Sequence, residues 1–204
     1  MTHILSPIIF SEIHIGTNVG NWAVELANVS SKPVDLSKYS IDIYQGSSTT
    51  RKVNIPLEGN IEPNSTFTIC YEEASQEIKD KSNFITSLLY IDGTYPLVLT
   101  KSNKKMDVLG VVGYRYDYAS SRSLVRKSNY MYGRLEYDEF DWLRHSEDNC
   151  KYLGNLNNSV TEEELLEGPH LTKEDFERPF AISNDVAGGG AIKVDLAYTG
   201  DGDT

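Results

Sequence analysis

The fold is decided by residues 8–28, which read IIFSEIHIGTNVGNWAVELAN. Apolar side chains stand on alternating positions in both halves of this stretch: Ile9, Ile13 and Ile15, then Trp22, Val24 and Leu26. A period of two places such side chains on one face of a strand. Residues 16–21 between the halves contain two glycines and two asparagines, which are typical of turns. The stretch therefore predicts two antiparallel strands joined by a turn.

Further short strands are expected as far as residue 126. Turn residues separate them about every 10 to 15 positions, as is typical of β-sandwiches and barrels. The expected strands are Tyr39–Tyr44, Val53–Leu57, Thr66–Cys70, Pro96–Leu99, Val108–Val112 and Ser123–Arg126. Only Glu73–Lys81 has the pattern of a short helix. The sequence thus predicts a mainly β fold.

The C-terminal part has a different composition. Residues 156–204 hold 3 basic and 11 acidic residues, so we expect one domain at 6–155 and an acidic arm at 156–204. Short helical turns are expected after Thr161 and Thr172, and one strand at 192–196. An arm of this size cannot bury its own apolar side chains, which predicts that it docks on a partner. The expected contact residues are Leu165, Leu166, Phe176, Phe180, Ile192, Val194 and Leu196.

Charge and composition argue against several classes of function. The net charge is −11, and an acidic chain is a poor ligand for the phosphates of nucleic acid. No stretch approaches the roughly 20 apolar residues of a membrane span. The first residues lack the pattern of a signal peptide, so we expect a virion or cytoplasmic location without Sec secretion. The two cysteines, Cys70 and Cys150, fit no metal or redox spacing.

Short motifs in a fixed order resemble a known family. They include Ser11-Glu12-Ile13, a strand from Trp22 to Asn28 containing Glu25-Leu26, and a Val34-Asp35-Leu36-Ser37 turn. Gly59–Asn64, Leu97–Leu99, Met106–Gly110, Ser123–Lys127 and Trp142 with Leu153-Gly154 follow in order. Over residues 8–154 the chain resembles the lamin-tail domain, an immunoglobulin-like module.

The resemblance implies an immunoglobulin-like β-sandwich, here with an extended C-terminal arm that contains short helices and one strand. It also implies a non-catalytic module that mediates assembly or attachment. We therefore expect a subunit of a larger assembly whose partners are other protein subunits, with a virion (capsid or head–tail) accessory protein as the concrete hypothesis. The alternatives are a cell-surface or envelope attachment module and an accessory binding domain of a nuclease system.

Few residues are candidates for catalysis or metal binding. Glu12 and Glu25, on adjacent predicted strands, could form a carboxylate pair for acid–base catalysis. The favoured alternative, which the resemblance implies, is that their oxygens accept hydrogen bonds from turn backbone. His14 is expected to form a surface pair with Glu12, and Cys70 to lie buried as a small apolar residue. The four histidines are scattered, so no catalytic residue, metal or cofactor is expected.

A tyrosine-rich insert is the most distinctive surface feature that we expect. Tyr114, Tyr116 and Tyr118 alternate with Arg115, Asp117 and Ala119, and Arg122 follows. Tyrosine and arginine are enriched at protein interfaces. We therefore assign Tyr114, Tyr116, Tyr118 and Arg122 to partner binding. The alternatives are an edge whose aromatic rings cover the sandwich, and stacking on nucleic acid.

Overall fold

The computed structural model describes residues 3–145 and 148–156, and within them the chain is mainly β, as predicted. The strands are β1 (His3–Ile4), β2 (Ile8–Ile15), β3 (Trp22–Asn28), β4 (Val34–Asp35), β5 (Tyr39–Tyr44), β6 (Arg51–Pro56), β7 (Asn60–Ile61), β8 (Thr66–Tyr71), β9 (Phe84–Thr86), β10 (Leu97–Lys101), β11 (Lys104–Leu109), β12 (Ser123–Arg126), β13 (Gly133–Arg134) and β14 (Trp142–His145). The helices are α1 (Gln76–Asp80) and the 3-10 turns η1 (Ser128–Tyr130) and η2 (Glu139–Asp141). The predicted arm lies outside the described residues.

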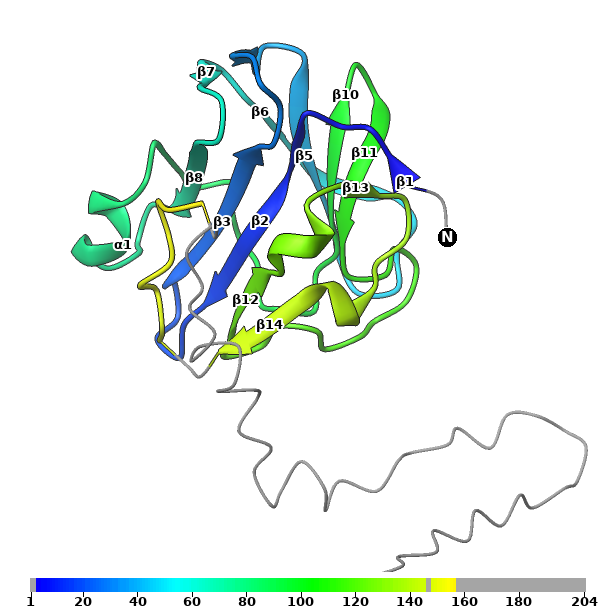
Figure 1. Cartoon of the computed structure of the whole chain (residues 1–204). Coiled ribbons are helices and arrows are strands. Elements are labelled where there is room, and N and C mark those ends of the chain that lie inside the picture. Colours follow the sequence, from blue (N-terminus) through cyan, green and yellow to red (C-terminus); the bar gives the residue numbers. More distant parts are fainter. Residues whose placement is uncertain (1–2, 146–147, 157–204) are drawn as a thin grey trace, which may run out of the picture. The chain divides into compact units, whose positions relative to one another are not determined.

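The larger sheet has six strands in the order β14-β12-β2-β3-β8-β9 (Figure 1). All neighbours are antiparallel except β8 and β9. The predicted hairpin is present as β2 and β3, and Glu12 lies opposite Glu25. The two glutamates therefore share one face of the sheet, as adjacent strands require.

The smaller sheet has four antiparallel strands in the order β11-β10-β5-β6. Two further pairs, β1 with β13 and β4 with β7, are antiparallel ladders of two residues each. The short strands β1, β4, β7, β9, β13 and β14 were not anticipated. Two or three residues are too few for an alternating pattern to stand out in sequence, and the two apolar residues of β14, Trp142 and Leu143, are adjacent and do not alternate.

One hydrophobic core lies between the two large sheets. Phe10, Ile13 and Val24 of the six-stranded sheet belong to the same buried cluster as Ile41 and Leu97 of the four-stranded sheet. Burial of each such side chain contributes about 1.5–3 kcal/mol relative to exposure. The shared core explains why the two sheets fold as one unit.

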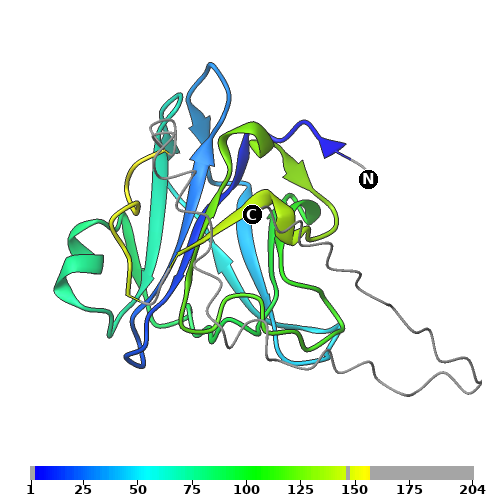
Figure 2. The ribbon, with the colours of Figure 1, turned by 60° about the horizontal axis from the view of Figure 1, so that its bottom comes forward.

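The outer face of the six-stranded sheet is also covered. Ala23 and Cys70, on that face, pack in a second buried cluster with Ile78 of α1 and with Cys150 and Leu153. The segment 148–156, here called the strap, therefore lies over the sheet beside α1 (yellow in Figures 1 and 2). Cys70 is buried, as expected, and both cysteines are free thiols.

The strand directions bring four connections to one end of the molecule. β2, β5, β9 and β11 all finish at this end, and the next strands of both sheets start there. The connections are residues 16–21, 45–50, 87–96 and 110–122, and we call this end, at the bottom of Figure 1, the loop end. Residues 29–38, 57–65, 102–103 and 127–141 connect strands at the opposite end.

Candidate functional site

Exposed apolar side chains gather at the loop end. Five of the eight large apolar side chains that are exposed among the described residues stand on its connections: Val19, Leu88, Tyr90, Val111 and Tyr114. Their exposed fractions lie between 42% for Val111 and 83% for Val19. Exposed apolar groups that gather in this way mark interaction sites. We call these five residues the loop-end surface.

A row of aromatic rings packs against Tyr90 of this surface. The ring of Trp22, which is buried, lies 4.8 Å from the ring of Tyr90 and 5.0 Å from that of Tyr71. Tyr90 continues the row to Tyr95, whose hydroxyl accepts a hydrogen bond of 2.8 Å from Gln45. Edge-to-face contacts between such rings contribute about 0.5–1.5 kcal/mol each. The row therefore fixes Tyr90 even though half of its side chain is exposed.

Hydrogen bonds tie two of the loops together. The amides of Tyr118 and Ala119 donate to the carbonyl of Gly93, and the hydroxyl of Ser120 donates to the carbonyl of Asp92. The Tyr118 hydroxyl donates to the carbonyl of Tyr95 at 2.8 Å. Residues 87–96 and 110–122 thus form one closely packed unit.

The four residues predicted from the tyrosine-rich insert have different environments. Tyr114 is 64% exposed and belongs to the loop-end surface. Tyr116 is half-buried and donates to Glu139 at 3.0 Å, and Arg122 is half-buried with its carbonyl bonded to the amide of Ile15. Tyr118 lies in the core, so its ring is not available to a partner. Residues 111–122 form no strand, because the chain turns at Gly113 and Ser121, both with positive φ.

Four residues of the loop-end surface were missed in the sequence: Val19, Leu88, Tyr90 and Val111. Val19 is a single apolar residue in a polar turn, and Leu88, Tyr90 and Val111 stand in short apolar runs that do not show which of their residues are exposed. Only the strand directions bring them to one end. The predicted contact residues of the arm (Leu165, Leu166, Phe176, Phe180, Ile192, Val194 and Leu196) lie outside the described residues.

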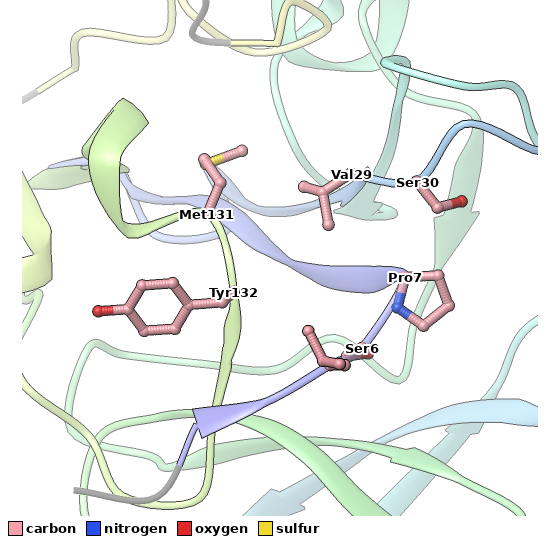
Figure 3. Close-up of a pocket in the computed structure, with 7 residues that line it drawn as sticks. Ser6, Pro7, Val29, Ser30, Met131 and Tyr132 are labelled. Carbon is pink, nitrogen blue, oxygen red and sulfur yellow. The ribbon is translucent and has the colours of Figure 1, made fainter.

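The opposite end exposes fewer large apolar side chains, namely Leu5 and Phe140. The exposed side chains on its connections include Lys32, Asp35, Lys38, Glu58 and Glu62. Near this end, Leu5, Pro7, Val29 and Met131 line an open cavity of about 370 Å³ together with Ser6, Ser30 and Tyr132 (Figure 3). No titratable group other than Tyr132 lines it, so it offers no acid–base chemistry.

The strap covers a layer of buried polar side chains. Glu12 and Glu25 are each 1% exposed. Glu25 accepts hydrogen bonds from the hydroxyls of Ser11 and Thr68 and from the amide of Gly154 in the strap. The last contact agrees with the hydrogen bond from turn backbone that the sequence suggested. For Glu12 Oε1, no hydrogen-bond partner is present among the described residues.

Burial dominates the ionisation of this layer. It raises the pKa of Glu12 well above its usual value, and the neighbouring Glu25 raises it further. Burial also raises the pKa of Glu25, although its three donors act in the opposite direction. Since Glu25 has donors and Glu12 Oε1 has none, the charge of the pair belongs on Glu25 and the proton on Glu12.

The expected surface pair of Glu12 and His14 is wrong, because the strap buries both. His14 is 1% exposed, and its Nδ1 lies 2.7 Å from the hydroxyl of Ser123, which donates to the carbonyl of Asn149. Burial lowers the pKa of His14. Its partner is therefore a hydroxyl, which suits a neutral imidazole.

The arrangement limits what this layer can do chemically. A substrate must reach a general acid or base, and the strap separates these groups from solvent. Within residues 3–145 and 148–156, no three or more His, Cys, Asp or Glu side chains are grouped to hold a metal ion. In the same range no helix is long and apolar enough to cross a membrane.

A second buried polar cluster is structural. Asp107 is completely buried and accepts from Arg126 at 2.7 Å and from the amides of Phe10 and Arg134. The Arg126 guanidinium lies over the Trp142 ring at 4.5 Å. Asp107 on β11 and Arg126 on β12 thus join the two large sheets through one ion pair.

No protein-family model matches this chain, and a search of curated proteins finds no similar sequence.

Proposed function

We propose that this chain is a non-enzymatic protein-binding module, a subunit of a larger assembly, and that the loop-end surface contacts the neighbouring subunit. The observation that supports this most is the asymmetry of the two ends. Five large apolar side chains are exposed on the four connections of the loop end, against two, Leu5 and Phe140, near the opposite end, where connections 29–38 and 57–65 expose charged groups. Two of the five, Tyr90 and Tyr114, are tyrosines, a residue type that is enriched at interface hot spots.

The loop end also has the rigidity that binding favours. The aromatic row fixes Tyr90, and the bonds to Gly93 and Asp92 hold the 110–122 loop against the 87–96 loop. A surface that is already ordered loses less conformational entropy on association. Loops held on a rigid β scaffold are a common place for binding sites.

Strand addition at the two edges of the four-stranded sheet is a weaker mode for this domain. At the β6 edge, Lys52 is an extra, bulged residue and Pro56 lacks an amide hydrogen, two features that protect edges from pairing. At the β11 edge, Gly133 lies so close that an added Cβ would be 2.2 Å from the Met106 carbonyl oxygen. We therefore place the partner at the loop end, and the arm at 156–204 on a neighbouring subunit.

The finer fold assignment belongs to the same proposal. Two sheets around one core, between which the chain passes from β3 to β5, β6 to β8, β9 to β10 and β11 to β12, support an immunoglobulin-like sandwich of the lamin-tail type. We infer that the chain is a virion accessory protein. The alternatives are a cell-surface or envelope attachment module and an accessory binding domain of a nuclease system.

Photo-crosslinking in the source cells tests the proposal. A benzophenone amino acid is placed at Tyr114 on the loop end or, as the control, at the exposed Glu62 on the opposite end of the full chain. We expect a discrete protein adduct from position 114, reduced at least about tenfold by Tyr90→Ala, because a central hot-spot tyrosine carries about 2 kcal/mol or more. Adducts from position 62 alone, or adducts that Tyr90→Ala leaves unchanged, would contradict it.

A further inference from the structure

The strap connects the buried glutamate pair with the loop end. Near its C-terminal end, the amide of Gly154 donates to Glu25 at 2.6 Å. At its start, Asp148 accepts from both the amide and the hydroxyl of Thr17, in the 16–21 connection that carries Val19. One short segment therefore touches the proton-binding pair and a loop of the proposed interface.

The strap is the part of this layer that can open most easily. It consists of turns and bends rather than a strand. Between its ends it is held by Ser123, which donates to the Asn149 carbonyl, and by Lys81, which donates to the Cys150 carbonyl. The Cys150 thiol donates to Glu77, the Tyr152 ring lies 4.7 Å from that of His145, and Cys150 and Leu153 pack on the sheet. Unlike the strands beneath it, it has no ladder of backbone hydrogen bonds, and such segments open locally before a sheet does.

We propose that the strap is a proton-controlled clasp for the loop end. It closes over Glu12 and Glu25 while the pair holds a proton, and it opens and releases the 16–21 connection when the proton is lost. This regulation rests on the proposed function, because the released loop belongs to the loop-end surface.

The physical reason is the environment of Glu12. Its Oε1 is buried without a hydrogen-bond partner among the described residues, which a neutral carboxyl tolerates far better than a carboxylate. Loss of the proton would place two carboxylates opposite each other on neighbouring strands. Opening the strap admits water to both and relieves their repulsion.

The other charged groups around Glu12 and Glu25 determine the pH range in which the strap is closed. Lys81, after α1, favours the ionised form of Glu12. His14 on β2 has a lowered pKa, so it gains a proton only in acid, where it would loosen the strap again. The remaining titratable groups nearby are Glu77 of α1, Cys70 of β8, and Asp148 and Cys150 of the strap. The closed strap is thus favoured between the pKa of His14 and that of Glu12.

Hydrogen exchange with mass spectrometry on the free full chain tests the clasp. Exchange of residues 148–156 and 16–21 is followed from about pH 5 to about pH 9, a range that contains the raised values known for buried glutamates. Because exchange itself accelerates with pH, the readout is the ratio of wild type to Glu12→Gln at each pH. Glu62→Gln, at the exposed opposite end, is the control with the same change of charge.

We expect both segments to exchange faster in wild type and in Glu62→Gln as the pH rises. Where loss of one proton controls opening, the ratio of the exchange rate in wild type to that in Glu12→Gln should grow by up to about tenfold per pH unit. Equal exchange in wild type and Glu12→Gln at every pH would overturn the clasp. Exchange of the β3 amides shows in the same experiment whether each variant is folded.

A second variant tests the link to the loop end. Asp148→Ala removes the acceptor of Thr17, so residues 16–21 should exchange faster at every pH while residues 150–154 keep their wild-type response. Unchanged exchange at 16–21 would overturn the link. Because the exchange experiments use the free chain without a partner, their results are independent of the crosslinking outcome. Either proposal, the clasp or the loop-end interface, can therefore be contradicted while the other stands.

Discussion

Two glycines of the loop end differ in whether a side chain could replace their hydrogen. Gly93 and Gly46 both have left-handed backbones, with φ of +83° and +58°. A Cβ on Gly93 would lie 2.2 Å from the amide nitrogen of Ser120, whereas one on Gly46 would have no atom within 4 Å. Gly93 therefore allows the 87–96 and 110–122 connections to approach each other.

Alanine at the two glycines should separate conformational strain from close packing. We expect Gly46→Ala to lower the free energy of unfolding by about 1 kcal/mol, the cost of a left-handed backbone with a side chain. Gly93→Ala should cost about 3 kcal/mol or more, because backbone must also move. Urea denaturation measures both. Equal losses would show that the contact with Ser120 is not tight.

Glu12 should make stability depend on pH in the opposite direction to most carboxylates. Because its pKa is raised in the folded state, the folded protein holds this proton more tightly than the unfolded chain does. Its contribution to the free energy of unfolding is fully present below the ordinary glutamate pKa of about 4.3 and is lost as the pH rises through the raised value.

Glu12→Gln should remove this dependence. Between wild type and variant, the difference in the free energy of unfolding should change by up to about 1.4 kcal/mol per pH unit between the ordinary glutamate pKa and the raised pKa, and should level off above it. Urea denaturation at a series of pH values measures it. A constant difference from acid to alkaline pH would contradict the raised pKa.

At the scale of elements, the ion pair of Asp107 and Arg126 joins strands of different sheets. Both side chains are buried, and Asp107 also holds the amides of Phe10 and Arg134. Removing one partner leaves the other charged and buried, which typically costs 3–5 kcal/mol. We therefore expect Arg126→Met to destabilise the fold by about that amount.

The matched control for this prediction is Arg51→Met. Arg51 pairs with Asp42 on the four-stranded sheet at 3.1 Å, but nearly half of its side chain is exposed. Exposed ion pairs contribute about 0–1 kcal/mol, so this loss should be small. Thermal denaturation compares the two variants. A small loss for Arg126→Met would show that burial of the pair matters less than we infer.

The sequence predicts several elements well, including the six-residue β5 and the four-residue β12. Tyr39–Tyr44 and Ser123–Arg126 match β5 and β12 residue for residue, and the 8–28 hairpin is present. The offset at Val108–Val112 has a physical cause: Gly110 has positive φ, which ends β11 at Leu109. The prediction that Ile9 shares a face with Ile13 and Ile15 is wrong, because a bulge between Phe10 and Glu12 shifts the alternation. Alternation also does not distinguish an exposed outer face from one that a strap covers. Hence Glu12 and His14 were placed on one face correctly and their burial was missed.

At the scale of the whole molecule, the candidate site is assembled from four distant connections. Tyr114 could be found because it stands in a tyrosine-rich insert, and Tyr118 was wrongly grouped with it because composition does not show which ring turns inward. Leu88, Tyr90 and Val19 come together only through strand directions. Local sequence patterns therefore do not predict an interface built from separate loops, although they do predict a mainly β core.

The central claim is that the loop end, and not the opposite end or a sheet edge, contacts the partner. Hydrogen exchange of the chain inside its native assembly, compared with the free full chain, tests it most directly. We expect slower exchange in the assembly at residues 16–21, 87–96 and 110–122, and unchanged exchange at 57–65. Protection at 57–65 or along β6, with the loop end unchanged, would contradict the account.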